Sequence, residues 1–164
     1  MDKANPPGNN QILFTKDQLT QLINFMASDI KREIETVKRG ENAGNFLSAL
    51  GLLVHTEILG GIIRGDLSTG NSAANFKEFF PRLGNEYAAL DSGKVYKEIR
   101  CEFVHEYAKN NTIVAMLKGT NKPPGMEFSA DGSIKMCVER YFGDFNKAAQ
   151  DLLSHFKGEK VAIG

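Results

Sequence analysis

Residues 15–39, TKDQLTQLINFMASDIKREIETVKR, decide the fold class, because their apolar positions recur at helical spacing. These positions are Leu19, Leu22, Ile23, Met26, Ile30, Ile34 and Val37. Thr15 and Gln18 have the spacing of a capping box at the start, and Gly40 favours an end. We therefore predict an amphipathic helix over residues 16–39, with its apolar face turned to a core.

Further helical segments follow this one along the chain. We expect them over residues 43–64, from Ser72 to a break at Pro81, over about 93–108 with Asp91 or Ser92 as the cap, and over about 138–157. The most apolar run lies in the first of these and is interrupted by His55 and Glu57. We interpret it as a buried core helix and not as a membrane span.

A strand-like pattern separates the last two helices. Residues 112–117 are β-like, and two short runs on either side of Asp131-Gly132 suit a hairpin closed by a two-residue type I′ turn. The sequence therefore predicts a mainly α fold, a bundle of about five helices with a small β-hairpin flap at about 112–137 inserted before the last helix. Residues 15–158 would form this single domain, after a disordered or loosely docked lead over residues 1–14.

The composition is that of an ordinary soluble globular protein. Among 164 residues, 20 Lys and Arg balance 20 Asp and Glu, 41% are hydrophobic and 24% are charged. This neutrality argues against a broad non-specific nucleic-acid binder but allows a local phosphate site. Two cysteines, Cys101 and Cys137, and a polar start indicate a reducing, cytoplasmic location. No phosphate-binding loop, dinucleotide motif or metal-ligand spacing is present, so we expect no cofactor and no metal.

The segment with chemical potential is residues 96–107, YKEIRCEFVHEY. On an α-helical wheel at about 100° per residue, an apolar stripe faces the bundle, and Arg100 and His105 flank the remaining face. Lys97 and Cys101 lie between them on this wheel. Because that face is only partly charged, we expect it to meet the same helix of a second copy, which would bring two Arg–His pairs into one cleft.

The spacing Arg100-x4-His105 resembles the Arg-x(4–6)-His signature of the HEPN superfamily of small helical bundles. With Tyr107 added, the pattern is similar to toxin members that pair with nucleotidyltransferase antitoxins. The resemblance implies a metal-independent endoribonuclease of defence, stress or toxin–antitoxin systems, with a composite site in a homodimer formed through about 93–108. His105 would transfer protons and Arg100 would contact the phosphate. Tyr107 would position the phosphate or be modified by the partner enzyme.

Two other hypotheses stay open. Many catalytic members of the superfamily carry Asn, Asp or His after the arginine, whereas this chain has Cys101, whose thiol is a poor hydrogen-bonding substitute. Cys101 therefore favours a catalytically inactive module that binds RNA, a nucleotide or a protein. The third hypothesis is a plain interaction protein in which the motif is coincidental. Glu57 would pair with a basic residue of another helix, with Arg100 as one candidate, and would support the site together with Lys97 and Cys101.

Overall fold

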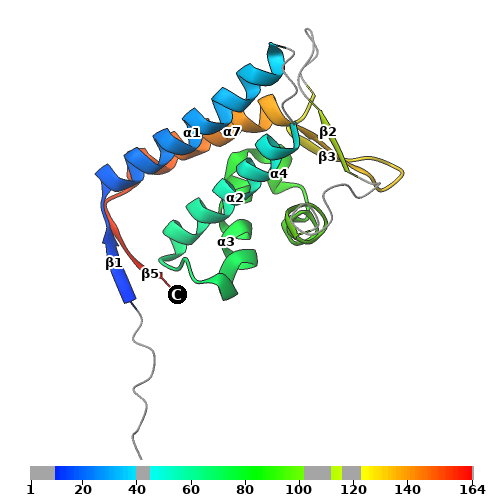
Figure 1. Cartoon of the computed structure of the whole chain (residues 1–164). Coiled ribbons are helices and arrows are strands. Elements are labelled where there is room, and N and C mark those ends of the chain that lie inside the picture. The colour runs from blue at the N-terminus through cyan, green and yellow to red at the C-terminus, as the bar shows by residue number, and fades with distance from the viewer. Residues whose placement is uncertain (1–9, 40–44, 102–111, 116–122, 164) are drawn as a thin grey trace, which may run out of the picture.

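Helix α1 (Lys16–Lys38) begins at the predicted capping box. The computed structural model describes residues 10–39, 45–101, 112–115 and 123–163. Thr15 Oγ1 accepts a hydrogen bond from the Gln18 backbone nitrogen. The Gln18 side chain in turn accepts one from the Thr15 nitrogen. The face that carries Leu19, Ile23, Met26, Ile30 and Ile34 is buried. The predicted amphipathic helix is therefore confirmed, and α1 packs against α2 and α7 (Figure 1).

Helix α2 (Asn45–Arg64) is the central helix of the bundle, in contact with α1, α3 and α7 (Figure 1). Its buried apolar side chains are Ala49, Leu52, Leu53, Leu59 and Ile62. Residues 46–64 are long and apolar enough to cross a membrane, but half of this stretch is buried inside the bundle. Gly65 ends the helix with φ of 68°, a left-handed conformation that suits glycine. This run therefore supplies side chains to the core of the bundle.

Two short helical segments follow and pack on α2. Helix α3 (Ser72–Phe79) comes after the 3₁₀ turn η1 (Thr69–Asn71). It lies so close to α2 that a Cβ atom on Gly60 would collide with the Asn75 carbonyl oxygen. Pro81 breaks the α-helix as predicted, because proline has no N–H to donate, and the chain continues as the 3₁₀ helix η2 (Phe80–Leu83). The absence of a side chain at Gly60 therefore sets the distance between α2 and α3.

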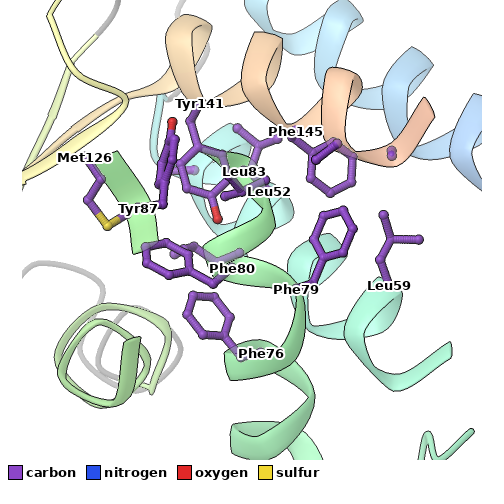
Figure 2. Packing of buried hydrophobic residues seen from close by; sticks show 14 of the residues in the cluster. Leu52, Leu59, Phe76, Phe79, Phe80, Leu83, Tyr87, Met126, Tyr141 and Phe145 are labelled. Carbon is purple, nitrogen blue, oxygen red and sulfur yellow. The ribbon is translucent and has the colours of Figure 1, made fainter. Parts of the chain in front are cut away.

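Aromatic side chains fill the core between α3, η2 and the last helix, α7 (Val138–His155) (Figure 2). The Phe80 ring lies 5.0 Å from that of Phe76 and 5.5 Å from that of Tyr87, in the short helix α4 (Asn85–Ala88). Tyr87 meets Tyr141 edge-on at 5.4 Å. Phe76, Phe79 and Phe80 are thus core residues. On α7, Tyr141 and Phe145 are fully buried, whereas Phe142 is only partly buried.

The sheet before α7 has three strands, β2 (Thr112–Ala115), β3 (Met126–Phe128) and β4 (Ile134–Cys137), in the order β2-β4-β3. β3 and β4 form the predicted antiparallel hairpin, and β2 runs parallel to β4. The predicted two-residue type I′ turn is wrong, because it needs positive φ at both central residues and here only Gly132 has it, with φ of 83°. Ser129 donates to the Ser133 carbonyl, so the connection has three residues.

The ends of the described chain pair with each other. β1 (Asn10–Phe14) runs antiparallel to β5 (Glu159–Ile163), from Asn10 opposite Ile163 to Phe14 opposite Glu159. Residues 10–14 thus form a strand inside the stretch expected as a loosely docked lead, and β5 lies beyond the expected last residue of the domain. Neither strand was predicted, because the two segments become a sheet only through a partner far away in the sequence.

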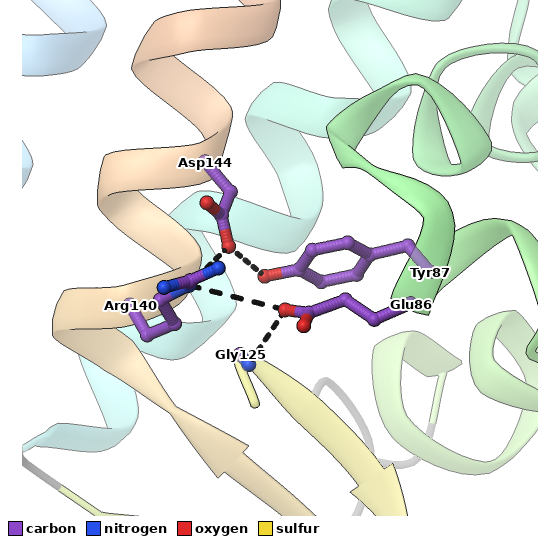
Figure 3. Close-up of polar contacts among 5 residues, drawn as sticks. All are labelled: Glu86, Tyr87, Gly125, Arg140 and Asp144. Atoms are coloured by element: carbon purple, nitrogen blue, oxygen red, sulfur yellow. Dashed lines mark hydrogen bonds and ion pairs between the residues drawn. The ribbon is translucent and has the colours of Figure 1, made fainter. Parts of the chain in front are cut away.

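A polar network joins α4, α7 and the start of β3 (Figure 3). Tyr87 donates its hydroxyl hydrogen to Asp144 Oδ2 at 2.9 Å, and Arg140 Nε donates to the same oxygen at 2.9 Å. The Gly125 nitrogen donates to Glu86 Oε1 at 3.2 Å, and this carboxylate also lies 3.9 Å from Arg140 Nε. Burial and the Asp144 carboxylate raise the pKa of Tyr87, which keeps the phenol protonated as the donor. The network therefore fixes the sheet to the bundle.

The close approach of α2 and α3 predicts a large cost for a single methyl group. We expect Gly60→Ala to lower the free energy of unfolding by about 2–3 kcal/mol, because the new Cβ collides with backbone and forces the helices apart. Gly143→Ala is the matched control, since it lies on α7 where a Cβ meets nothing within 4 Å. It should stabilise the protein by up to about 1 kcal/mol through helix propensity. Urea denaturation measures both, and equal effects of the two substitutions would contradict the close packing.

Candidate functional site

The motif segment enters through a short helix and then winds more widely than predicted. Asp91 caps helix α5 (Ser92–Val95) by accepting hydrogen bonds from the backbone nitrogens of Gly93 and Lys94. The chain then forms a π-helix, η3 (Tyr96–Cys101), in place of the predicted α-helix. A π-turn bonds residues five apart, so an α-helical wheel does not give the faces of these residues. The predicted helix start is confirmed, and the predicted winding is wrong.

Arg100 is turned towards the central helix of the bundle. Its Nε donates a hydrogen bond to Glu57 Oε2 of α2 at 2.7 Å, and the side chains of Arg100 and Glu57 are only 22% and 13% exposed. The pairing that the sequence suggested for the buried carboxylate is therefore present. The α-helical wheel had placed the guanidinium on the face that points away from the bundle. Because of its bond to Glu57, the guanidinium lies along α2 instead.

An aromatic ring supports the same guanidinium from another side. Arg100 Cζ lies 5.7 Å from the ring centroid of Tyr96, and this ring packs against Phe76 of α3 at 5.6 Å. Burial raises the pKa of Tyr96, and the positive charge of Arg100 opposes that shift. Within the described part of the chain, the terminal Nη atoms of Arg100 have no hydrogen-bond partner. Among the described residues, the guanidinium is thus held through Nε and by the ring.

The other residues of the predicted site are only partly gathered around Arg100. Lys97 is exposed on η3, and Cys101 is a half-buried free thiol next to Arg100. His105 and Tyr107 lie outside the described residues. Among the residues that the structure describes, no three His, Cys, Asp or Glu side chains come together in a way that could hold a metal ion. Of the proposed supporting residues, Glu57 contacts Arg100, and Cys101 is the next residue in the chain.

His55, two residues before Glu57 on α2, is half-buried beside the aromatic core. Its ring centroid lies 6.1 Å from that of Phe145, and its Nδ1 is buried without a hydrogen-bond partner among the described residues. Burial lowers the pKa of His55, and the negative charge of Asp29 on α1 opposes this shift. The folded protein therefore holds this imidazole in its neutral form at a pH where a free histidine would be charged.

A groove elsewhere on the surface has the volume of a small-molecule site. It measures about 520 Å³ and lies between η2 and α7, with Arg82 and Lys147 among its lining residues. Arg82 already donates to the Glu78 carboxylate at 2.6 Å, and Asp151 adds a negative charge to the wall. Neither Arg100 nor Glu57 lines the groove. No pattern in the sequence marks this groove, because its walls come from two separate elements, η2 and α7.

The Glu57–Arg100 contact predicts a measurable coupling energy. In a double-mutant cycle with Glu57→Gln and Arg100→Gln, we expect a coupling on the order of 1–3 kcal/mol, since each single change leaves a half-buried charge without its partner. The exposed pair Glu78–Arg82, at 2.6 Å, is the matched control and should give less than about 1 kcal/mol. Unfolding in urea provides all the values, and equal coupling in both cycles would contradict the burial of the first pair.

His55 predicts a loss of stability in mild acid. The pKa of His55 is lower in the folded protein than in the unfolded chain, where it is about 6.5. The contribution of His55 to the free energy of unfolding is therefore complete above that pH. It is lost as the pH falls below that value, because the unfolded chain takes up the proton first. The urea midpoint should therefore fall between about pH 7.5 and about pH 5.5, and it should fall less in His55→Phe. His155→Gln, at an exposed histidine, should behave like the wild type. An unchanged fall in His55→Phe would contradict the assignment.

Comparisons with known proteins add no assignment to this geometry. No protein-family model, no curated protein and no solved structure matches the chain.

Proposed function

We propose that the chain is a HEPN-like, metal-independent endoribonuclease in which Arg100 binds the scissile phosphate and His105 transfers protons. The observation that supports this proposal is the fixed guanidinium, held at Nε by Glu57 and against the ring of Tyr96. An arginine that has lost its rotational freedom presents its remaining N–H donors in one orientation, which suits the planar, bidentate recognition of phosphate oxygens.

The reaction uses the ribose as its own nucleophile. A general base takes the proton of a 2′-hydroxyl, and the 2′-oxygen attacks the neighbouring phosphorus. The bond from phosphorus to the 5′-oxygen breaks, and a general acid protonates that oxygen, which leaves a 2′,3′-cyclic phosphate and a 5′-hydroxyl. Arg100 stabilises the negative charge that grows on the phosphoryl oxygens. An imidazole with a pKa near 6.5 can serve in either protonation role, which makes His105 the candidate acid and base.

Two copies of the chain supply both protonation roles at once. A homodimer formed through the segment of about 93–108 places one His105 as base and the other as acid, with two arginines around one phosphate. Lys97, exposed on η3, adds positive charge beside such a cleft. As the family resemblance implies, Tyr107 is then the hydroxyl that a nucleotidyltransferase-type antitoxin would modify to silence the site.

Cys101 favours a second candidate, an inactive module that binds RNA without cutting it. The residue directly after Arg100 is a half-buried thiol, a weak hydrogen-bonding group at a position where a strong one helps to organise a reacting phosphate. In this case the guanidinium still binds a phosphate, but the groups that stabilise the transition state are incomplete. The two candidates share one ligand chemistry and differ in whether a bond is broken.

Incubation of the purified protein with single-stranded RNA in EDTA tests the proposal. We expect cleavage that leaves cyclic phosphate ends, and we expect Arg100→Ala and His105→Ala each to lower the rate by at least about 100-fold. RNA with 2′-deoxy residues should resist, because it lacks the nucleophile. Arg82→Ala is the matched control, since it removes another arginine that is paired with a glutamate, and it should leave the rate unchanged.

Each remaining result selects between the candidates. Binding without cleavage, weakened by Arg100→Ala but not by Arg82→Ala, identifies the inactive module. Cleavage that survives both Arg100→Ala and His105→Ala excludes this mechanism. A protein that neither binds nor cuts RNA contradicts both candidates and leaves the plain interaction protein as the hypothesis that holds.

A further inference from the structure

The exposed face of α1 carries a stripe of residues that nothing in the described structure covers. Its members lie opposite the buried stripe and all are exposed: Asp17, Gln21, Asn24, Phe25, Ser28 and Arg32. We call this set the α1 outer stripe. At its centre Phe25 is 69% exposed, the largest fraction for any large hydrophobic residue among those that the structure describes. Helix α1 lies at the edge of the bundle, so the stripe faces away from the other helices (Figure 1).

The stripe is symmetric about the midpoint between Asn24 and Phe25. Gln21 and Ser28 are equally far from this midpoint along the helix, and so are Asp17 and Arg32. An antiparallel second copy, related by a two-fold axis through the midpoint, therefore sets each Asp17 against the partner's Arg32 at both ends of the contact. Asp17 of one copy meets Arg32 of the other, and the dipoles of the two antiparallel helices attract each other.

The surface at the centre of the stripe has the shape that such a contact needs. Gln21, Asn24, Phe25 and Ser28 line a hollow of about 260 Å³. These residues are spaced i, i+3, i+4 and i+7, which is the set of four that forms a hole for a side chain of a facing helix in knobs-into-holes packing. In the antiparallel arrangement, the partner's Phe25 is the large apolar side chain that comes next to this hollow.

Arg32 is available for such a contact although it already has a neighbour. It pairs with Asp29 of the same helix at 2.9 Å, but the two side chains are 69% and 60% exposed. An exposed pair three residues apart is held weakly, so Arg32 can turn to the partner's Asp17 at little cost. The equal numbers of acidic and basic residues in the chain, 20 of each, also mean that two copies do not repel each other through net charge.

We propose that a second copy of this chain docks antiparallel on the α1 outer stripe, with Phe25 of each copy inserted into the hollow of the other. The 23 residues of α1 make a helix about 34 Å long and about 10 Å wide. The area of this helix face is smaller than the roughly 800 Å² that each partner buries in a standard interface. The contact is therefore weak and reversible. It uses a different helix from the motif segment and does not depend on any activity towards RNA.

Sedimentation equilibrium of the full chain, from about 1 to about 500 µM, tests this interface. We expect reversible association that Phe25→Lys weakens by at least about 10-fold, because a charged side chain cannot fill the hollow. Leu47→Lys is the matched control, since it also replaces an exposed apolar residue, 55% exposed on α2, and it should associate like the wild type. Phe25 has no part in the core, so both variants should keep the circular dichroism and melting temperature of the folded protein.

A charge exchange tests the antiparallel orientation. Asp17→Arg sets two positive charges against each other at both ends of the contact and should weaken association by about 10-fold. The double variant Asp17→Arg with Arg32→Asp restores opposite charges and should recover most of the loss. A monomeric wild type at every concentration would overturn the proposal, as would association that Phe25→Lys leaves unchanged. If copies also pair through the motif segment, Phe25→Lys removes only the species larger than that dimer, which supports the proposal.

Discussion

The close packing of α3 on α2 is the constraint on which the rest of the structure depends. Gly60 lets the Asn75 backbone approach α2 so closely that no other residue fits there. This approach brings Phe76 into the core and under the ring of Tyr96, and Tyr96 in turn supports the guanidinium of Arg100. A wider gap between the two helices would move α3, and with it the surface on which η3 lies. The position of the candidate site therefore depends on two helices that contribute few of its functional groups.

Local chemistry in the sequence was enough to predict most helix boundaries. The capping box at Thr15, the break at Pro81 and the cap at Asp91 each act through hydrogen bonds within a few residues, so they can be read without knowledge of the fold. The pairing of β1 with β5 depends on a partner at the other end of the chain, and no local pattern marks it. The connection at Gly132 shows a further limit, because the sequence Asp-Gly suits more than one hairpin loop.

The candidate site was predictable in its residues more than in its geometry. Sequence reasoning singled out Arg100 and Glu57, and a costly buried carboxylate was reason enough to expect their contact. The π-helical winding of η3 was not visible, because the same apolar residues, Val95 and Ile99, satisfy an α-helical and a π-helical turn alike. One added residue in a turn is enough to rotate the next side chain from solvent towards α2. Helix faces assigned from an ideal α-helical wheel are correct only where the segment is wound as an α-helix.

The Glu57–Arg100 pair is difficult to explain as a device for stability alone. Taking two charges out of water costs several kcal/mol per ion, so a half-buried ion pair holds α2 and η3 together no better than two apolar side chains of similar volume would. The bundle already has ample apolar contact at this point, with Ile99 fully buried beside the arginine. What an apolar pair cannot supply is a guanidinium held in one orientation. The proposed contact with a phosphate would account for a charge placed against the central helix, because it needs a guanidinium held in one orientation.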